Sequence, residues 1–324
     1  MKKTLCNPVI VLCLVLFTGV VGYAEENIAK YPSRPISFIH PFPAGTSAEL
    51  AVRLLSQEAQ KFLGQPIVIV NKPGGVGTLG VAAVATARPD GYTLGNTPHS
   101  PMFVVPHLQG VPYNPLQDFT MILQFASFNV GVIVKADAPF KSFKDLIAFA
   151  RQNPKKLTYA TPGTNSMQYI IMEQIAKQEK VQFTHIPFKA TNEAQMALLG
   201  GHIAFAAGDF NYSMVESGDV RLLLLFREER SAEYPHTPVL KDLGYDLPYP
   251  TFITVSGPKG LPPGIVKKLE GAFTKAMKEP AFVKGMKEDI RLPIVYRNSK
   301  DLTKYVAYNY DTYGRTLKDM GLIK

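Results

Sequence analysis

The sequence lacks an apolar run long enough to cross a membrane. Its most apolar stretch covers residues 9–21, which is 13 residues, whereas a membrane-spanning helix needs roughly 20. Two lysines precede this stretch, and Gly22-Tyr23-Ala24 follows it with small residues at the −3 and −1 positions of a cleavage site after Ala24. The pattern predicts a secretory signal peptide over residues 1–24; a transmembrane helix is the weaker alternative.

Cysteine is scarce as well. The chain has two, Cys6 and Cys13, and both lie inside the predicted signal peptide, so the exported chain would carry no thiol, no disulfide and no cysteine-bound metal. The six histidines show neither H-x-x-x-H nor H-E-x-x-H spacing. We therefore expect no metal site and no cofactor.

Long runs of like charge are also missing. The formal charge of +9 falls to +7 when residues 1–24 are removed, because Lys2 and Lys3 leave 33 basic residues against 26 acidic ones. The remaining lysines and arginines are scattered, with nothing longer than pairs such as Lys155-Lys156. Nucleic-acid binding needs a basic stripe, so no nucleic-acid partner is predicted and a mild attraction for small anions is the better interpretation.

The 300 residues that remain are too many for one typical core, which predicts two domains. Short apolar strands alternate with helical patterns, as in α/β proteins with a parallel sheet. The clearest strands are expected at 67–70, 131–134, 157–160, 183–186, 203–206, 222–226 and 252–255. The clearest helices are expected to start near Ser142, Asn165, Thr191 and Pro263, with a last one over residues 299–320.

The most informative segment is 31–63, which reads as a strand, a tight glycine loop and an amphipathic helix. Apolar and polar residues alternate from Ile36 to His40, and apolar residues then recur with helical spacing. Thr46 and Glu49 fit a capping box, which marks the start of the helix. Because the first turn of a helix presents unpaired N–H groups and the positive end of its dipole, this loop is a plausible anion site.

Two further loops share this arrangement. Residues 161–166 and 188–192 each follow a predicted strand and lead into a predicted helix. In parallel α/β sheets, ligands bind beyond the carboxyl ends of the strands, so three such loops could hold two negatively charged groups. On these residues alone, the alternative that all three are ordinary capped connections stays open.

Two motifs point to other functions but fit poorly. Residues 75–80 match G-x-G-x-x-G, yet four turn residues separate them from the preceding strand and no acid follows about 20 residues on, so a glycine-rich turn before a short helix over 79–87 is expected instead. Ser47 stands in Gly45-Thr46-Ser47-Ala48-Glu49, which would be a nucleophile elbow if residue 49 were glycine. A secreted serine hydrolase using Ser47 therefore remains an alternative, next to a capping or ligand-contacting role for Ser47.

The order of segments resembles the extracytoplasmic receptors of tripartite tricarboxylate transporters, also called Bug-type receptors. The landmarks are YPSRPISFIHPFPAG (31–45), LGQPIVIVNKPGGVGTLG (63–80), ARPDGYTL (87–94), TPGTNS (161–166), HIPFKA (185–190), LLGGHIAFAAG (198–208) and GPKGLP (257–262). The resemblance implies a two-lobed periplasmic binding protein of the type II, Venus flytrap kind, with a ligand cleft between its lobes and no catalytic activity. We expect lobe 1 to comprise residues 25–124 and 253–324, and lobe 2 residues 125–252.

The resemblance also implies which residues bind the ligand. By position, the first loop would grip one carboxylate through backbone amides, and the loops of the second lobe would complete the site. The residues carried over or added from neighbouring loops are Phe42, Ala44, Gly45, Thr46, Ser47, Ala48, Thr97, His99, Gly163, Thr164, Asn165, Ser166, Tyr169, Lys189, Ala190 and Asp209. Thr46, Glu49, Asn165, Tyr169 and Ala190 depart from the usual family pattern, so the substrate cannot be inferred from the family.

Asp209 has two interpretations. In a pocket it could pair with an ammonium group of the ligand, whereas on the surface it would simply be solvated, and we favour the surface. The expected partners are a small carboxylate (a di- or tricarboxylate or an aromatic acid) and the membrane permease subunits of the transporter, with the receptor itself a periplasmic monomer. A sensory partner of a membrane kinase is the alternative role.

Overall fold

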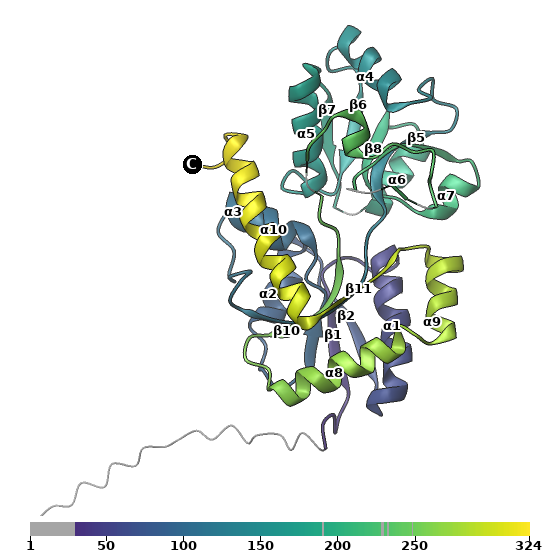
Figure 1. Ribbon diagram of the computed structural model, residues 1–324. Helices are drawn as coiled ribbons and strands as arrows, with labels where there is room; N and C mark the ends of the chain where they lie inside the picture. The colour runs from purple at the N-terminus through teal and green to yellow at the C-terminus, as the bar shows by residue number, and fades with distance from the viewer. Residues whose placement is uncertain (1–29, 190, 228–229, 232, 248) are drawn as a thin grey trace, which may run out of the picture.

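The chain folds around two separate sheets, one above the other in Figure 1. The computed structural model describes residues 30–189, 191–227, 230–231, 233–247 and 249–324. The predicted signal peptide and Ala190 lie outside the described residues. In the described part no helix is long and apolar enough to cross a membrane.

The first sheet has six strands in the order β11-β4-β10-β3-β1-β2. β1 lies parallel to β2 and β3, whereas β10 is antiparallel to β3 and β4, and β11 is antiparallel to β4. This sheet therefore combines strands from both ends of the chain. Its strands are β1 (Ile36–His40), β2 (Ile67–Asn71), β3 (Thr93–Gly95), β4 (Phe119–Ala126), β10 (Ile253–Pro258) and β11 (Ile294–Asn298).

The second sheet has five strands in the order β7-β6-β8-β5-β9. β6 is parallel to β7 and β8, and β5 is antiparallel to β8 and β9. All of its strands come from the middle of the chain: β5 (Val130–Lys135), β6 (Thr158–Thr161), β7 (Thr184–Pro187), β8 (Phe205–Asp209) and β9 (Val220–Leu225). We call the parts built on the first and second sheets lobe 1 and lobe 2; the exact residue bounds between them stay a prediction.

Helices cover both sheets. In lobe 1, α1 packs against α8 (Figure 1). The helix α10 contacts β4. The lobe 1 helices are α1 (Ser47–Leu63), η1 (Gly75–Gly77), α2 (Thr78–Ala85), η2 (Ser100–Val104), α3 (Val105–Leu108), α8 (Pro263–Ala276), α9 (Pro280–Lys284), η4 (Gly285–Ile290) and α10 (Ser299–Asp319). Those of lobe 2 are α4 (Phe143–Gln152), α5 (Met167–Glu179), α6 (Thr191–Leu199), α7 (Tyr212–Glu216) and η3 (Leu240–Leu243).

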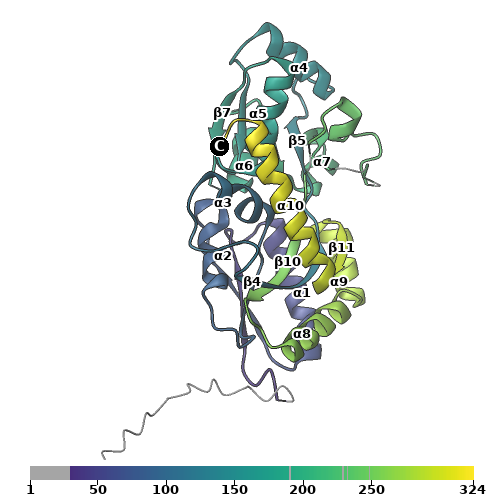
Figure 2. The ribbon, with the colours of Figure 1, turned by 60° about the vertical axis from the view of Figure 1, so that its left-hand side comes forward.

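The C-terminal helix reaches from lobe 1 toward lobe 2. Figure 2 shows α10 rising beside α3 until its end lies near α5. Met320 and Leu322 of this end line one surface pocket together with Tyr169 of α5. The chain end thus contacts the second lobe although its helix belongs to the first.

Local sequence signals explain most helix starts. Ser142 and Asp145 form the expected capping box before α4, with the Asp145 N–H donating to Ser142 Oγ at 3.2 Å. The prediction of Asn165 as the cap of α5 is wrong by one residue, because the side chain of Ser166 accepts the N–H of Tyr169. After the strand β2, Gly74, Gly75 and Gly77 have positive φ and form the turn that opens α2.

The expectation of parallel sheets is wrong in part, because both sheets are mixed. The antiparallel strands β4 and β5 lie on either side of residues 127–129, where the chain first crosses between lobes, and β10 follows the return crossing at residues 249–252. No clear strand was predicted for β3, β4 or β11. β3 is three residues long and β11 is only half-buried, and both features weaken the apolar pattern that identifies a strand.

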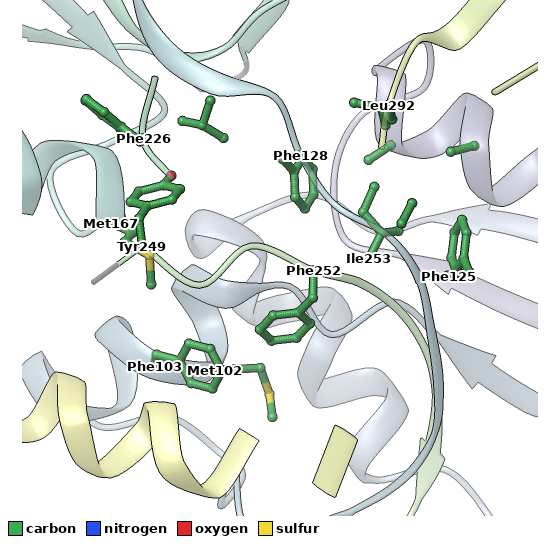
Figure 3. Close-up of a cluster of buried hydrophobic side chains, with 14 of the residues drawn as sticks. Met102, Phe103, Phe125, Phe128, Met167, Phe226, Tyr249, Phe252, Ile253 and Leu292 are labelled. Carbon is green, nitrogen blue, oxygen red and sulfur yellow. The ribbon is translucent and has the colours of Figure 1, made fainter. Parts of the chain in front are cut away.

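Aromatic side chains fill the region where the chain crosses between the lobes. Figure 3 shows Phe128, Tyr249 and Phe252 on the crossing segments, with Phe103 from lobe 1 and Phe226 from lobe 2 near them. The ring of Phe103 packs on Phe252 at 5.2 Å, and the ring of Phe226 packs on Tyr249 at 5.4 Å. The two crossings are therefore part of a continuous apolar core and lie against both lobes.

Candidate functional site

A cleft lies between the two lobes. Both lobes and the first crossing contribute to its walls, which is the usual arrangement for a small-molecule site at a domain boundary. From lobe 1 and the crossing it is lined by Phe42, Pro43, Thr46, Ala48, Val76, His99, Ser100 and Phe128. From lobe 2 it is lined by Pro162, Gln168, Lys189, Thr191 and Asp209.

The N-terminus of α1 forms part of the lobe 1 wall. The N–H of Glu49 donates to Thr46 Oγ1 at 3.3 Å, and the N–H of Gly45 donates to Glu49 Oε2 at 3.3 Å. The capping box is therefore shifted, since the glutamate takes the N–H of Gly45 in place of that of Thr46. Among the described residues, the N–H groups of Ser47 and Ala48 keep no protein acceptor, so they are free to donate to an anion.

The lobe 2 wall supplies a cation. Lys189 follows β7, is exposed, and lines the cleft together with Thr191 at the start of α6. A lysine ammonium and the first turn of a helix both favour negative charge. The two lobes thus present groups that favour an anion from opposite sides of the cleft.

Three polar atoms in the cleft wall are buried and have no hydrogen-bond partner among the described residues: Nδ1 of His99, Oε1 of Gln168 and Oδ1 of Asp209. His99 packs edge-on against Phe128, with ring centroids 5.3 Å apart, and burial lowers its pKa to about 3. Its imidazole is therefore neutral near pH 7. Buried polar groups normally have partners, so three unpaired atoms in one cleft indicate a place for polar groups of a ligand.

Asp209 corrects one sequence-based expectation. We favoured a solvated surface position, but the side chain lies partly buried at the end of β8 and lines the cleft. The register of β8 against β5, in which Asp209 lies opposite Val130, places it beside the crossing and away from bulk solvent. Burial raises the pKa of its carboxyl to about 7.

A pH effect on stability follows for the ligand-free protein. The pKa of Asp209 is about 7 in the fold against its usual 3.8, so between these values the folded chain holds a proton that the unfolded chain has released. The contribution of Asp209 to the free energy of unfolding is fully present below about pH 4 and is lost as the pH rises through 7. The groups around it are Lys189 and His99 in the cleft and Tyr249 on the second crossing.

The test compares thermal unfolding of wild type and Asp209→Asn at pH 4.5 and pH 8. We expect the wild-type Tm to fall by a few degrees more than that of the variant between these two conditions. Equal falls in both proteins would show that the Asp209 carboxyl does not titrate abnormally.

The loop over residues 161–166 contributes less to the cleft than predicted. Its Pro162 lines the cleft, whereas Gly163, Thr164, Asn165 and Ser166 do not. The reason is that this loop packs on lobe 1: the N–H of Met167 donates to Ser100 Oγ at 3.2 Å, and Asn165 Nδ2 donates to Gln109 Oε1 at 3.1 Å. These hydrogen-bond donors therefore join lobe 2 to lobe 1.

Tyr169 and Thr97 also lie away from the cleft wall. The ring of Tyr169 packs on His185 at 4.6 Å and borders the pocket beside the chain end. Thr97 is buried, and its Oγ1 lies 2.9 Å from Ser256 Oγ and 3.2 Å from Thr254 Oγ1, so its hydroxyl belongs to the polar interior of lobe 1. Three predicted residues of the first loop and the start of α1 do not line the cleft: Ala44, Gly45 and Ser47.

The structure brings together Phe42, Thr46, Ala48, His99, Lys189 and Asp209 of the predicted set. It adds Pro43, Val76, Ser100, Phe128, Pro162, Gln168 and Thr191. The sequence could have indicated Thr191 and Gln168 as site residues, since both stand in the first turn of a predicted helix that follows a strand. No sequence pattern indicates Val76 or Phe128 as a site residue, because their positions depend on how the two lobes meet.

A second set of polar contacts joins the lobes outside the residues that line the cleft. Arg291, after η4 of lobe 1, forms an ion pair with Glu216 of α7 at 2.8 Å, and its guanidinium lies 4.1 Å from the ring centroid of Tyr212. The carbonyl of Arg291 accepts a hydrogen bond from Asn129 Nδ2 of the first crossing at 2.7 Å. Polar contacts therefore join the lobes both at Ser100 and Gln109 and at Arg291.

Metal and hydrolase chemistry find no support in the described part of the chain. No group of three or more histidine, cysteine, aspartate or glutamate side chains is placed to hold a metal there. Ser47 has no hydrogen bond with any described histidine, and neither ring nitrogen of the buried His40 has a partner among the described residues. A serine nucleophile requires a base within hydrogen-bond reach.

Comparison with known proteins gives relatives over nearly the whole chain. A protein of Cupriavidus necator, "UPF0065 protein in gbd 5'region", is 36% identical over 302 residues, which is 93% of this chain and 92% of that protein. The solved periplasmic binding protein BugD is 26% identical with a TM-score of 0.82, over 91% of this chain and 100% of BugD. MatC of Rhodopseudomonas palustris, solved with bound malate, is 25% identical with a TM-score of 0.80, over 88% of this chain and 99% of MatC.

The family model "Tripartite tricarboxylate transporter family receptor" matches residues 51–322. That match confirms the resemblance and, with the structural likeness to BugD, the two-lobed periplasmic-binding-protein fold. The family is one of binding receptors without enzymatic activity. This chain belongs to the receptors of the tripartite tricarboxylate transporter family.

Proposed function

We propose that this chain is a periplasmic receptor that captures a small organic carboxylate between its lobes and delivers it to the membrane permease of a tripartite tricarboxylate transporter. The observation that carries the proposal is the pair of anion-favouring groups on opposite walls of the cleft. The free N–H groups at the start of α1 come from lobe 1, and Lys189 with the start of α6 comes from lobe 2. The malate bound by MatC supports a carboxylate as the ligand class.

Capture on both walls also accounts for the two-lobed design. A ligand that contacts α1 and Lys189 at once binds the closed arrangement more tightly than an open one, so it favours closure by differential affinity. The closed lobes would then present a continuous surface to the permease. Export to the periplasm by residues 1–24 places the receptor where such a permease collects its substrate.

The direct test is to purify the exported chain, record its native mass spectrum and identify any small molecule that travels with it. Isothermal titration then measures the affinity for that molecule and for a panel of mono-, di- and tricarboxylates. A carboxylate with a Kd in the micromolar range or tighter is expected. Failure of every carboxylate to bind, together with an uncharged or cationic copurified ligand, would refute the proposal.

Replacing Lys189 by methionine tests the lobe 2 wall. The variant keeps most of the side-chain volume and removes the charge, so the affinity for the bound carboxylate is expected to fall about tenfold, the effect of one charge-assisted hydrogen bond. Lys156→Met, an exposed lysine of the same lobe outside the cleft, is the matched control and should bind as wild type does. Equal affinities for Lys189→Met and wild type would remove Lys189 from the site.

A further inference from the structure

The charges of the cleft point to a more specific class of ligand. Among the described residues that line it, Lys189 and Asp209 are the two with ionisable carboxylate or ammonium side chains, so above about pH 7 the cleft carries one positive and one negative group. A plain dicarboxylate would bring its second negative charge into a cleft that already holds Asp209. A ligand with one positive and one negative group would match both walls.

The unpaired atoms of the cleft agree with this distribution. Oε1 of Gln168 can only accept hydrogen bonds, and Oδ1 of Asp209 can only accept them when its carboxyl is ionised. Nδ1 of the neutral His99 accepts a hydrogen bond when the ring proton is on Nε2. A primary ammonium has three N–H donors and no acceptor. Three buried acceptors that lack a donor among the described residues could each accept one N–H of an ammonium group.

The aromatic surroundings suit a cation as well. Phe128 lines the cleft and packs against His99, and Tyr249 also packs against His99 with ring centroids 5.6 Å apart. Aromatic faces attract cations, and the effect grows where water is excluded. Asp209 is also close enough to Tyr249 for its charge to raise the pKa of that phenol further.

We infer that the receptor recognises an amino-carboxylate, with the carboxylate of the ligand at the start of α1 and its ammonium group at Asp209, Gln168 and His99. The inference rests on the proposed function and names the ligand class of the same site. Asp209 is then the residue that separates amino acids from the corresponding plain carboxylic acids. Because α1 belongs to lobe 1 and Asp209 to lobe 2, the distance between the two charged groups of the ligand would decide how well the lobes close on it.

The experiment titrates three matched pairs that differ only in the amine: L-aspartate and succinate, L-glutamate and glutarate, and L-phenylalanine and 3-phenylpropanoate. Titration at pH 8 keeps the Asp209 carboxyl, with its pKa near 7, ionised. Within the pair whose size fits best, the wild-type receptor is expected to bind the amino member at least ~10-fold more tightly.

Asp209→Asn keeps the shape of the side chain and removes its charge. The variant should lose that preference by a factor of ~10–100 and should bind the plain acid as well as wild type or better, because the repulsion between two negative groups has gone. Asp246→Asn, on the exposed surface of lobe 2, changes the net charge equally and should leave both affinities unchanged. Thermal unfolding of each variant checks that it is folded.

The outcomes separate this inference from the proposed function. If the plain acids bind as tightly as their amino counterparts, or if Asp209→Asn weakens both members equally, the amino-carboxylate assignment is wrong while carboxylate capture stands. If none of the six acids binds the wild-type protein, both are overturned. A preference for the amino member that disappears in Asp209→Asn establishes the assignment.

Discussion

Ala48→Glu is expected to lower the affinity for the carboxylate ligand at least ~100-fold. Ala48 stands in the first turn of α1, is buried, and lines the cleft. A glutamate at this position would place its own carboxylate at the positive end of the helix and compete with the ligand from within the chain. Repulsion between the two carboxylates adds to the loss, which corresponds to about 3 kcal/mol of binding free energy.

Ala48→Gln is the matched control for this substitution. Glutamine has nearly the same volume as glutamate and no charge, so it reports the steric part of the effect alone. Isothermal titration of both variants should show a distinctly smaller loss for glutamine, and thermal unfolding of both variants checks that each is folded. If the two variants lose affinity equally, crowding and not charge is responsible, and the proposed carboxylate position at α1 is wrong.

The lobe 1 half of the site was predictable because its signals are local. A strand, a glycine loop and the Thr46 cap follow one another within a dozen residues, and neighbouring residues in the chain decide where such a helix starts. The same local rules located all five described strands of lobe 2 and three of the six described strands of lobe 1. They also placed Lys189, which stands directly between a strand and a helix.

The lobe 2 half was predicted less well because it depends on contacts between distant segments. The loop 161–166 resembles the first loop in sequence, yet the start of α5 after it donates to Ser100, 67 residues earlier in the chain. No sequence pattern in the loop predicts the hydrogen bond to Ser100. Asp209 was misjudged for a related reason, since the register between β8 and β5 decides whether a polar residue at a strand end meets solvent or a cleft.

Gly131→Ala is expected to destabilise the protein by ~3 kcal/mol or more. Gly131 lies in β5 between β8 and β9, and a Cβ built on it would stand 2.2 Å from the carbonyl oxygen of Leu224. That oxygen belongs to the neighbouring backbone and cannot turn aside as a flexible side chain could. The β5–β9 pairing must therefore move to admit a single methyl group, which is a larger disturbance than ordinary overpacking of a core.

Gly110→Ala is the control, because a Cβ at Gly110 would meet no atom within 4 Å. Denaturant unfolding of both variants should place Gly110→Ala within about 0.5 kcal/mol of wild type and Gly131→Ala far below it. The effect should extend to binding, since β5 begins at the end of the first crossing and Val130 lies opposite Asp209. A Gly131→Ala protein with wild-type stability would show that β5 and β9 lie farther apart than described, and the position of Asp209 in the cleft would then need to be determined again.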